Sequence, residues 1–152
     1  MSTPTELPAA FGHAAFPALW GYLSEVTAEL GIGLESCVLD HDIPVSAYIA
    51  LDVRLPHYPG RDVALLWDER YGWSVAIETH SGEDLIVLRY LGGDSVIPAP
   101  QSVARFVAAV EADDHALGRP NAMIIREATD LAELESMLTG VRRSFGRAVV
   151  VR

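Results

Sequence analysis

Hydrophobic residues recur along the chain with two different periods, and these periods predict its elements. Near the N-terminus they follow helical spacing, with Pro17 placed for a first helical turn and Gly31 for a stop. This pattern predicts an amphipathic helix over residues 17–30. A second apolar stripe with the same spacing, preceded by prolines, predicts another helix over residues 100–112.

The centre of the chain alternates between apolar and polar residues, as half-buried strands do. The alternation predicts four strands, at residues 46–55, 62–68, 73–78 and 84–91. Two prolines and a glycine end the first of these strands, because proline cannot donate to a ladder. The short connections that follow predict an antiparallel meander.

The two connections between the last three strands are each four residues long and end in glycine. Residues 69–72 and 79–82 therefore suit a turn closed by a glycine with positive φ. The pairs that this turn predicts are Trp67 with Val75, Leu65 with Ile77, Ile77 with Leu85, and Val75 with Val87. A continuous apolar sheet face would result, made of Val63, Leu65, Trp67, Trp73, Val75, Ile77, Leu85 and Val87.

The C-terminal part has its own pattern of strand, helix and strand. Its candidate elements are a strand at residues 122–126, a helix opened by Thr129 or Asp130, and a strand at residues 148–151. This order predicts a β-α-β extension over residues 119–152, packed on the core or on a partner subunit. With residues 1–15 as a loose leader, the sequence predicts an α+β fold whose core, residues 16–118, has the order α-β-β-β-β-α.

Composition and charge narrow the class of protein. The chain has 152 residues, half of them hydrophobic, which is enough for one ordinary core. Its formal charge of −10 would repel phosphate groups, so we expect no nucleic-acid partner. No apolar run approaches the ~18 residues of a membrane span, and residues 1–16 lack the cations of a signal peptide. We therefore expect no membrane partner and a cytoplasmic location.

The basic residues and the single cysteine exclude several chemistries. There is no lysine, so Schiff-base chemistry and a pyridoxal phosphate anchor are impossible, and we expect no cofactor. Cys37 is the only cysteine, which excludes an internal disulfide, and we expect it to be a small buried residue rather than a nucleophile. Acidic residues outnumber arginines by 17 to 5 up to Gly118, whereas six arginines face four acids from Arg119 onward. The tail could therefore dock on an acidic surface.

A family resemblance rests on one long run, RLPHYPGRDVALLWDERYGWSVAIETHSGEDLIVLRYLGGDSVIPAPQSVARFVAAV, at residues 54–110. The run resembles a family of small acidic actinobacterial proteins known only as a domain of unknown function. The resemblance covers about residues 17–112. It implies a shared fold, and it brings no activity, ligand or catalytic residue with it.

The second face of the predicted sheet is where function could lie. It would display Asp62, Ala64, Leu66, Asp68, Ser74, Ala76, Glu78, Asp84, Ile86, Leu88 and Tyr90. Glu78 would lie opposite Asp84, with His80 in the adjoining turn. Two carboxylates beside an imidazole are the minimum for acid–base catalysis or for binding a cation. The candidate catalytic residues are therefore Glu78, Asp84 and His80, and the candidate ligand-binding residues are Asp62, Ser74, Tyr90 and Arg54. A charged hairpin end that simply faces water explains the same residues equally well.

Two other segments carry residue types that suit chemistry. Asp40, His41 and Asp42 have metal-ligand side chains, but three consecutive residues seldom converge on one ion. We therefore expect a solvated loop there and no metal site. His57 and Tyr58 lie between two prolines, in a loop that is expected to be exposed and could form a lid.

An apolar second face needs cover, from the C-terminal segment or from another subunit. The sequence therefore predicts a non-catalytic domain that binds a protein partner or a small molecule, most simply as a homodimer. Helix–meander–helix designs of this sort also occur in chaperone-like dimers, which is an analogy of fold alone. The alternative is a small acid–base enzyme that acts on a small molecule through the Glu/Asp/His cluster. A transcription regulator would require the tail arginines to gather on one face.

Overall fold

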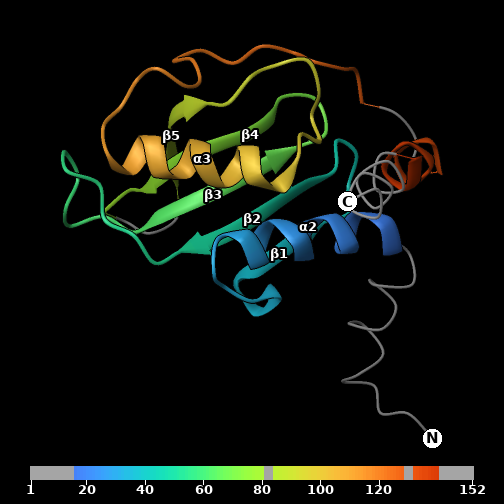
Figure 1. The fold of residues 1–152 in the computed structure, drawn as a ribbon, viewed down its shortest axis with the longest axis horizontal. Helices are drawn as coiled ribbons and strands as arrows, with labels where there is room; N and C mark the ends of the chain where they lie inside the picture. Colours follow the sequence, from blue (N-terminus) through green and yellow to red (C-terminus); the bar gives the residue numbers. More distant parts are fainter. Residues whose placement is uncertain (1–15, 81–83, 129–131, 141–152) are drawn as a thin grey trace, which may run out of the picture.

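Five antiparallel strands form the centre of the computed structural model, which describes residues 16–80, 84–128 and 132–140 (Figure 1). They lie side by side in chain order: β1 (Cys37–Asp40), β2 (Ser46–Leu51), β3 (Val63–Asp68), β4 (Gly72–Glu78) and β5 (Leu85–Tyr90). The predicted α+β class and antiparallel meander are confirmed. The predicted number of strands is wrong, because β1 was not among the predicted strands. This strand has only four residues and follows a 3-10 turn, η1 (Leu34–Ser36), so it is too short to show an alternating pattern.

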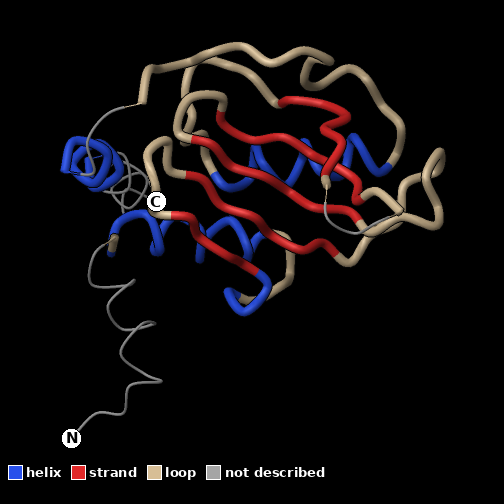
Figure 2. The backbone as a smooth tube through the Cα atoms, turned by 180° about the vertical axis from the view of Figure 1, so that it is seen from behind, coloured by secondary structure: helices blue, strands red, loops and turns tan. Residues whose placement is uncertain are grey.

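Two helices, α2 (Pro17–Glu29) and α3 (Pro100–Glu111), cover one face of the sheet. They lie in front of the strands in Figure 1, and Figure 2 shows the opposite face with no helix across it. Both begin with a proline in the first turn, as the sequence predicts, and a glycine with positive φ, Gly31, follows α2. None of the described helices is long and apolar enough to cross a membrane.

The core lies between these helices and the strands. The predicted apolar face is confirmed for β3 and β4, where alternate residues from Val63 to Ile77 are buried. Trp67 Nε1 donates a hydrogen bond to the carbonyl of Val96 at 2.7 Å. Trp73 Nε1 donates to the Tyr22 hydroxyl at 3.1 Å. These aromatic side chains therefore bury their rings and still satisfy their polar atoms.

The first hairpin has a tighter turn than the sequence predicts. Asp68 pairs directly with Gly72, which has a φ of 76°, and the Asp68 carboxylate accepts a hydrogen bond from the Arg70 amide at 2.7 Å. Trp67 therefore lies opposite Trp73 rather than opposite Val75. The shift is two residues, so every side chain remains on its predicted face.

The second hairpin shifts by one residue, and this changes the face. Ile77 pairs with Ile86 rather than with Leu85, and a bulge between Val75 and Ala76 then changes the register again. Leu85 and Val87 consequently lie on the face away from the helices, where the sequence places them in the core. The predicted four-residue turn at residues 79–82 includes residues 81 and 82, which lie outside the part of the chain that the structure describes.

The C-terminal segment differs most from its prediction. Residues 122–126 form no strand; the chain instead makes one bridge from Arg119 to Tyr90, and the Ile125 amide then donates a hydrogen bond to the Arg70 carbonyl of the first hairpin at 2.7 Å. Residues 132–140 are helical, as predicted. Leu134 and Leu138 of this helix join the hydrophobic core. The predicted strand at 148–151 lies outside the described residues.

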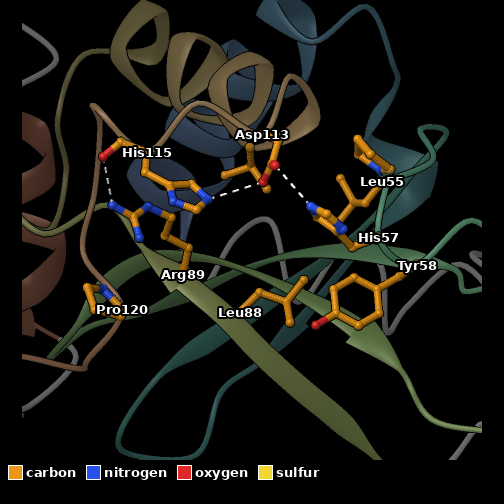
Figure 3. Close-up of a pocket in the computed structure, with 10 residues that line it drawn as sticks. Leu55, His57, Tyr58, Leu88, Arg89, Asp113, His115 and Pro120 are labelled. Atoms are coloured by element: carbon orange, nitrogen blue, oxygen red, sulfur yellow. Dashed lines mark hydrogen bonds and ion pairs between the residues drawn. The ribbon is translucent and has the colours of Figure 1, made fainter.

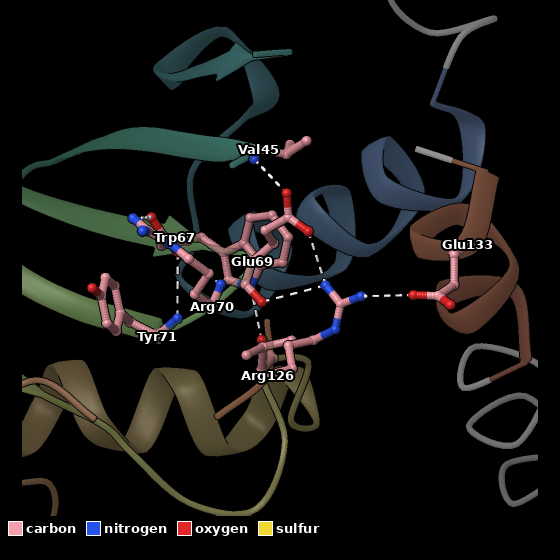
Figure 4. Close-up of polar contacts among 9 residues, drawn as sticks. Val45, Trp67, Glu69, Arg70, Tyr71, Arg126 and Glu133 are labelled. Carbon is pink, nitrogen blue, oxygen red and sulfur yellow. Dashed lines mark hydrogen bonds and ion pairs between the residues drawn. The ribbon is translucent and has the colours of Figure 1, made fainter. Parts of the chain in front are cut away.

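Glu69, in the first hairpin turn, is a charged residue with no exposed surface. Its Oε2 atom accepts a hydrogen bond from the Val45 amide at 2.7 Å, and its Oε1 atom forms an ion pair with Arg126 at 2.9 Å. Arg126 also lies 3.4 Å from Glu133 (Figure 4). In addition, Glu135 accepts hydrogen bonds from the first amides of α2, which would otherwise lack partners. These contacts fasten the C-terminal helix to both the hairpin and α2.

Candidate functional site

The face of the sheet away from the helices consists of rows of residues that cross the strands. One row is Val38, Tyr48, Leu66, Ser74 and Tyr90. On one side of it lies the row Ala50, Ala64, Ala76 and Val87, and on the other the row Asp40, Ser46, Asp68 and Gly72. We call these three rows, with Glu78 and Leu85, the open face.

A hollow of about 430 Å³ lies on the open face. Its charged lining residues are Asp40 and Asp68, and its aromatic rim includes Tyr48, Tyr71 and Tyr90. No arginine or histidine of the described residues lines it. The lining itself therefore consists of carboxylates, aromatic rings and uncharged residues.

Tyr48 crosses the open face diagonally. Its hydroxyl donates a hydrogen bond to Glu78 Oε2 at 2.7 Å, and this bond joins β2 to β4 above β3. The alanines of the neighbouring row on β3 and β4, Ala64 and Ala76, have no exposed surface. Burial, together with the hydrogen bond to Glu78 and its charge, raises the pKa of Tyr48 to about 12. The phenol is therefore neutral at physiological pH and acts as a hydrogen-bond donor.

One edge of the hollow already holds a cation against an aromatic ring. The Arg70 guanidinium lies 4.6 Å from the centre of the Tyr71 ring, and it forms an ion pair with Asp68 at 3.1 Å. Tyr71 in turn meets Tyr90 edge to face, with 6.5 Å between the ring centres. The arrangement combines a cation–π contact with charge pairing.

Two of the predicted ligand-binding residues come together in this hollow. Ser74 and Tyr90 are direct cross-strand partners, and both line it. The predicted pairing of Glu78 with Asp84 is wrong: Glu78 lies opposite Leu85, because the second hairpin is shifted by one residue. Asp84 is exposed, and its carbonyl accepts a hydrogen bond from the Thr79 amide at 3.0 Å.

The remaining predicted site residues lie around the end of the sheet. His80 Nε2 is 2.9 Å from an Arg61 nitrogen, and no hydrogen bond joins its ring to the Glu78 carboxylate among the described residues. Arg54 and Asp62 form an ion pair at 3.1 Å whose side chains are 60% and 69% exposed. Exposed pairs of this kind contribute little to stability. The structure therefore does not assemble the predicted Glu/Asp/His cluster.

The loop predicted at residues 40–42 is only partly present: Asp40 is the last residue of β1, and His41 and Asp42 lie in the loop that follows it. The His41 ring stacks on Phe16, with 4.7 Å between the ring centres. The Asp42 amide donates to the Asp40 carboxylate at 3.0 Å. Within the described part of the chain, no group of three His, Cys, Asp or Glu side chains has the arrangement of a metal site.

The model of a family of unknown function, DUF6292, matches residues 22–109. The chain belongs to this family. The predicted resemblance to a family of unknown function is thus confirmed. No curated protein and no solved structure matches the chain. The range matched to DUF6292 includes every residue that lines the hollow on the open face.

Several residues of the hollow are ones that the sequence pattern does not assign to the second face of the sheet. Asp40 reaches it because β1 adds an edge to the sheet, and Tyr71 reaches it because the first hairpin turn is tight. The sequence pattern places no function on Tyr48, whose bond to Glu78 crosses the intervening strand β3. The sequence does contain one signal of the hollow. A tyrosine lies on or beside each of three strands, and these strands carry short polar residues on the same face.

Proposed function

We propose that the protein is a non-catalytic binding domain whose open face holds an arginine- or lysine-bearing segment of a partner protein. The observation that carries this proposal is the lining of the hollow. It offers the carboxylate of Asp40 and three tyrosine rings, and its second carboxylate, Asp68, is paired with Arg70 at the edge of the hollow. Carboxylates attract a cation, and tyrosine rings provide faces on which it can lie.

Arg70 supports the cationic nature of the partner. Its guanidinium lies on the Tyr71 ring and is paired with Asp68, so this edge already accommodates the group that a partner would bring. The formal charge of −10 acts in the same direction, because long-range attraction accelerates the association of a basic partner.

The apolar part of the open face favours a protein segment over a small cation. Val38 on β1 is 64% exposed, and Leu85 on β5 is 38% exposed. They lie on the two edge strands and flank the hollow. Exposed apolar side chains around a polar centre are typical of protein interfaces.

A second copy of the chain is another possible occupant. From Arg119 onward the chain carries six arginines and four acidic residues, so its tail has the charge that the hollow selects. In this form the protein would be a chaperone-like or regulatory homodimer. Light scattering at micromolar concentration distinguishes the two forms, and a monomeric mass would exclude the dimer.

The acid–base enzyme receives less support. Glu78, the central residue of that hypothesis, lies opposite Leu85, and its carboxylate accepts the hydrogen bond of Tyr48. The pKa of that phenol, about 12, makes it a weak proton donor near neutral pH. His80 and Asp84 lie outside this contact.

The test uses a short synthetic peptide that alternates arginine and leucine, and the same peptide with citrulline in place of arginine. We expect the arginine peptide to bind at least about tenfold more tightly in calorimetry, since citrulline removes the charge and keeps the shape. Asp40→Asn should weaken the arginine peptide and leave the citrulline peptide unchanged.

Asp94→Asn is the matched control, because Asp94 is an exposed carboxylate outside the hollow. It removes the same charge from the protein and should leave both affinities unchanged. Equal binding of the two peptides, or equal loss with both variants, would show that only overall charge matters and would overturn the proposal.

A further inference from the structure

A second and larger pocket lies at the other side of the sheet, between the loop after β2, β5 and the segment that follows α3. Its volume is about 520 Å³. Leu55, Leu88 and Val110 give it apolar walls, and His57, His115 and Asp113 form its polar rim (Figure 3). Asp113 and His115 lie beyond the range matched to the family, so the family match does not imply this pocket.

Asp113 occupies a position at which an aspartate opposes stability. It follows the C-cap of α3 with a φ of 58°, and it is the one non-glycine residue with positive φ in the described part of the chain. Its amide and that of Asp114 close the helix onto the carbonyls of Val110 and Ala109, an arrangement that usually ends in glycine. The negative charge also lies at the negative end of the helix dipole. Such a choice of residue points to a role outside folding.

The two histidines account for this aspartate. His57 Nε2 lies 2.9 Å from one carboxylate oxygen of Asp113, and His115 Nε2 lies 3.1 Å from the other. These hydrogen bonds lower the pKa of Asp113, so the carboxylate is ionised near neutral pH.

The carboxylate also fixes the tautomer of both rings. An ionised carboxylate only accepts hydrogen bonds, so each Nε2 must carry a hydrogen. In the neutral ring the other nitrogen, Nδ1, is then an acceptor. Neither His57 Nδ1 nor His115 Nδ1 has a hydrogen-bond partner among the described residues. In the neutral rings both Nδ1 atoms are therefore acceptors at the rim of the pocket, where each of the two side chains is 69% exposed.

Arg89 sets the charge of the pocket. Its guanidinium donates to the carbonyls of His115, Leu117 and Gly118 at 2.9 to 3.0 Å, which holds the segment after α3 against β5. Its positive charge offsets the negative charge of the Asp113 carboxylate. When both imidazoles are neutral, Arg89 and Asp113 together leave the polar part of the pocket without a net charge. It therefore favours neither an anion nor a cation.

We propose that this pocket binds a small uncharged molecule with an apolar body and a hydroxyl group, whose hydrogen is accepted by Nδ1 of His57 or His115. The apolar walls hold the body, and Asp113 keeps both acceptors in the required tautomer. Figure 3 shows the two rings on opposite sides of Asp113, which suits hydrogen bonding to a ligand more than joint ligation of one metal ion. The described residues likewise contain no three-ligand metal group.

The experiment uses four probes that share a phenyl ring: benzyl alcohol, benzyl methyl ether, benzoate and benzylamine. Affinities are measured by NMR titration near pH 8, where an ordinary imidazole is neutral. We expect benzyl alcohol to bind at least about fivefold more tightly than the ether, which corresponds to one hydrogen bond. Benzoate and benzylamine should bind more weakly than the alcohol.

His57→Phe and His115→Phe keep an aromatic ring at each position and remove both ring nitrogens, and with them the acceptor Nδ1. The double variant should bind the alcohol and the ether equally. His80→Phe is the matched control, because His80 is exposed and outside the pocket. Val110→Trp should fill the pocket and abolish binding of all four probes, which separates the pocket from the molecular surface.

Three results would overturn the proposal. The first is equal affinity for the alcohol and the ether in the unaltered protein. The second is a preference for the alcohol that survives in the double histidine variant. The third is the lack of saturable binding by any of the four probes at millimolar concentration.

Discussion

The two faces of the sheet come from the same five strands and yet are built on different principles. Toward the helices, β3 and β4 present large apolar side chains that are almost wholly buried, such as Leu65 and Trp67. Away from them, the same strands present small or polar residues, such as Ala64 and Ser74, below a network of tyrosines and carboxylates. One face serves stability through burial, and the other leaves a hollow with hydrogen-bonding and charged groups.

The comparison teaches that exposure is not uniform on the open face. Ala64 and Ala76 are as buried as core residues, because their side chains are short and the Tyr48 side chain reaches across the sheet to Glu78. These two alanines do not line the hollow, whose strand residues on β3 and β4 include Leu66 and Ser74.

The largest expected effect compares two adjacent leucines of β3 that point to opposite faces. Leu65→Ala should destabilise the protein by about 2 to 5 kcal/mol, because it leaves a cavity under the helices. Leu66→Ala, on the open face, should cost less than about 1 kcal/mol. Urea unfolding of the two variants measures both values. Similar losses would mean that the open face is covered in solution.

A smaller effect is expected on the open face itself. Tyr48→Phe removes the hydrogen bond to Glu78 and should cost about 1 kcal/mol. The folded-state pKa of Tyr48, about 12, exceeds its ordinary value of 10.0, so the folded protein holds this proton more tightly than the unfolded chain.

This raised pKa gives the effect a defined pH dependence. The stabilisation is complete below the ordinary pKa and is lost as the pH rises toward about 12. Unfolding titrations of the parent and of Tyr48→Phe should therefore converge at alkaline pH. Tyr22, whose pKa is also raised by burial, is present in both proteins and cancels in the difference. Parallel curves would contradict the role given to this hydrogen bond.

The last comparison concerns the chemical reactivity of thiols on the two faces rather than stability. Cys37 is buried on the helix side, and burial raises its pKa to about 11 from 9.0. Near pH 8 it should react with a thiol reagent at least about a hundredfold more slowly than a free thiol. A cysteine introduced by Ser46→Cys, in a Cys37→Ala background, should react readily. Rapid modification of native Cys37 would show that the helix-covered face opens.

Much of the fold follows from local pattern. The helix periods, the alternation in β2 to β4 and the proline and glycine punctuation each predict an element that is present. The second hairpin is the exception, because its pairing depends on a bulge and on a turn that no local pattern specifies. That shift alone moves Leu85 and Val87 to the open face and separates Glu78 from Asp84.

Only part of the candidate site could be predicted from the sequence. Ser74 and Tyr90 were predicted on the correct face. Alternation along β4 places Ser74 there, and the bulge in the pairing of β4 with β5 returns Tyr90 to its predicted face. Asp40 and Tyr71 could not be assigned, because they reach the hollow through an added edge strand and a tight turn. His57 is 56 positions from Asp113 in the sequence, so the two residues meet only in the folded chain.

The sequence by itself determined which residues seek burial and where the chain bends, because hydrophobic period and backbone restriction act over a few residues. Only the tertiary structure decided which strands meet in which register and which charges lie together. The pair of Glu69 and Arg126 illustrates this point: each is an ordinary charged residue in the sequence, and their contact joins segments 57 positions apart. Contacts at such separation depend on the whole fold, because the chain entropy lost in forming them is repaid only by collective packing.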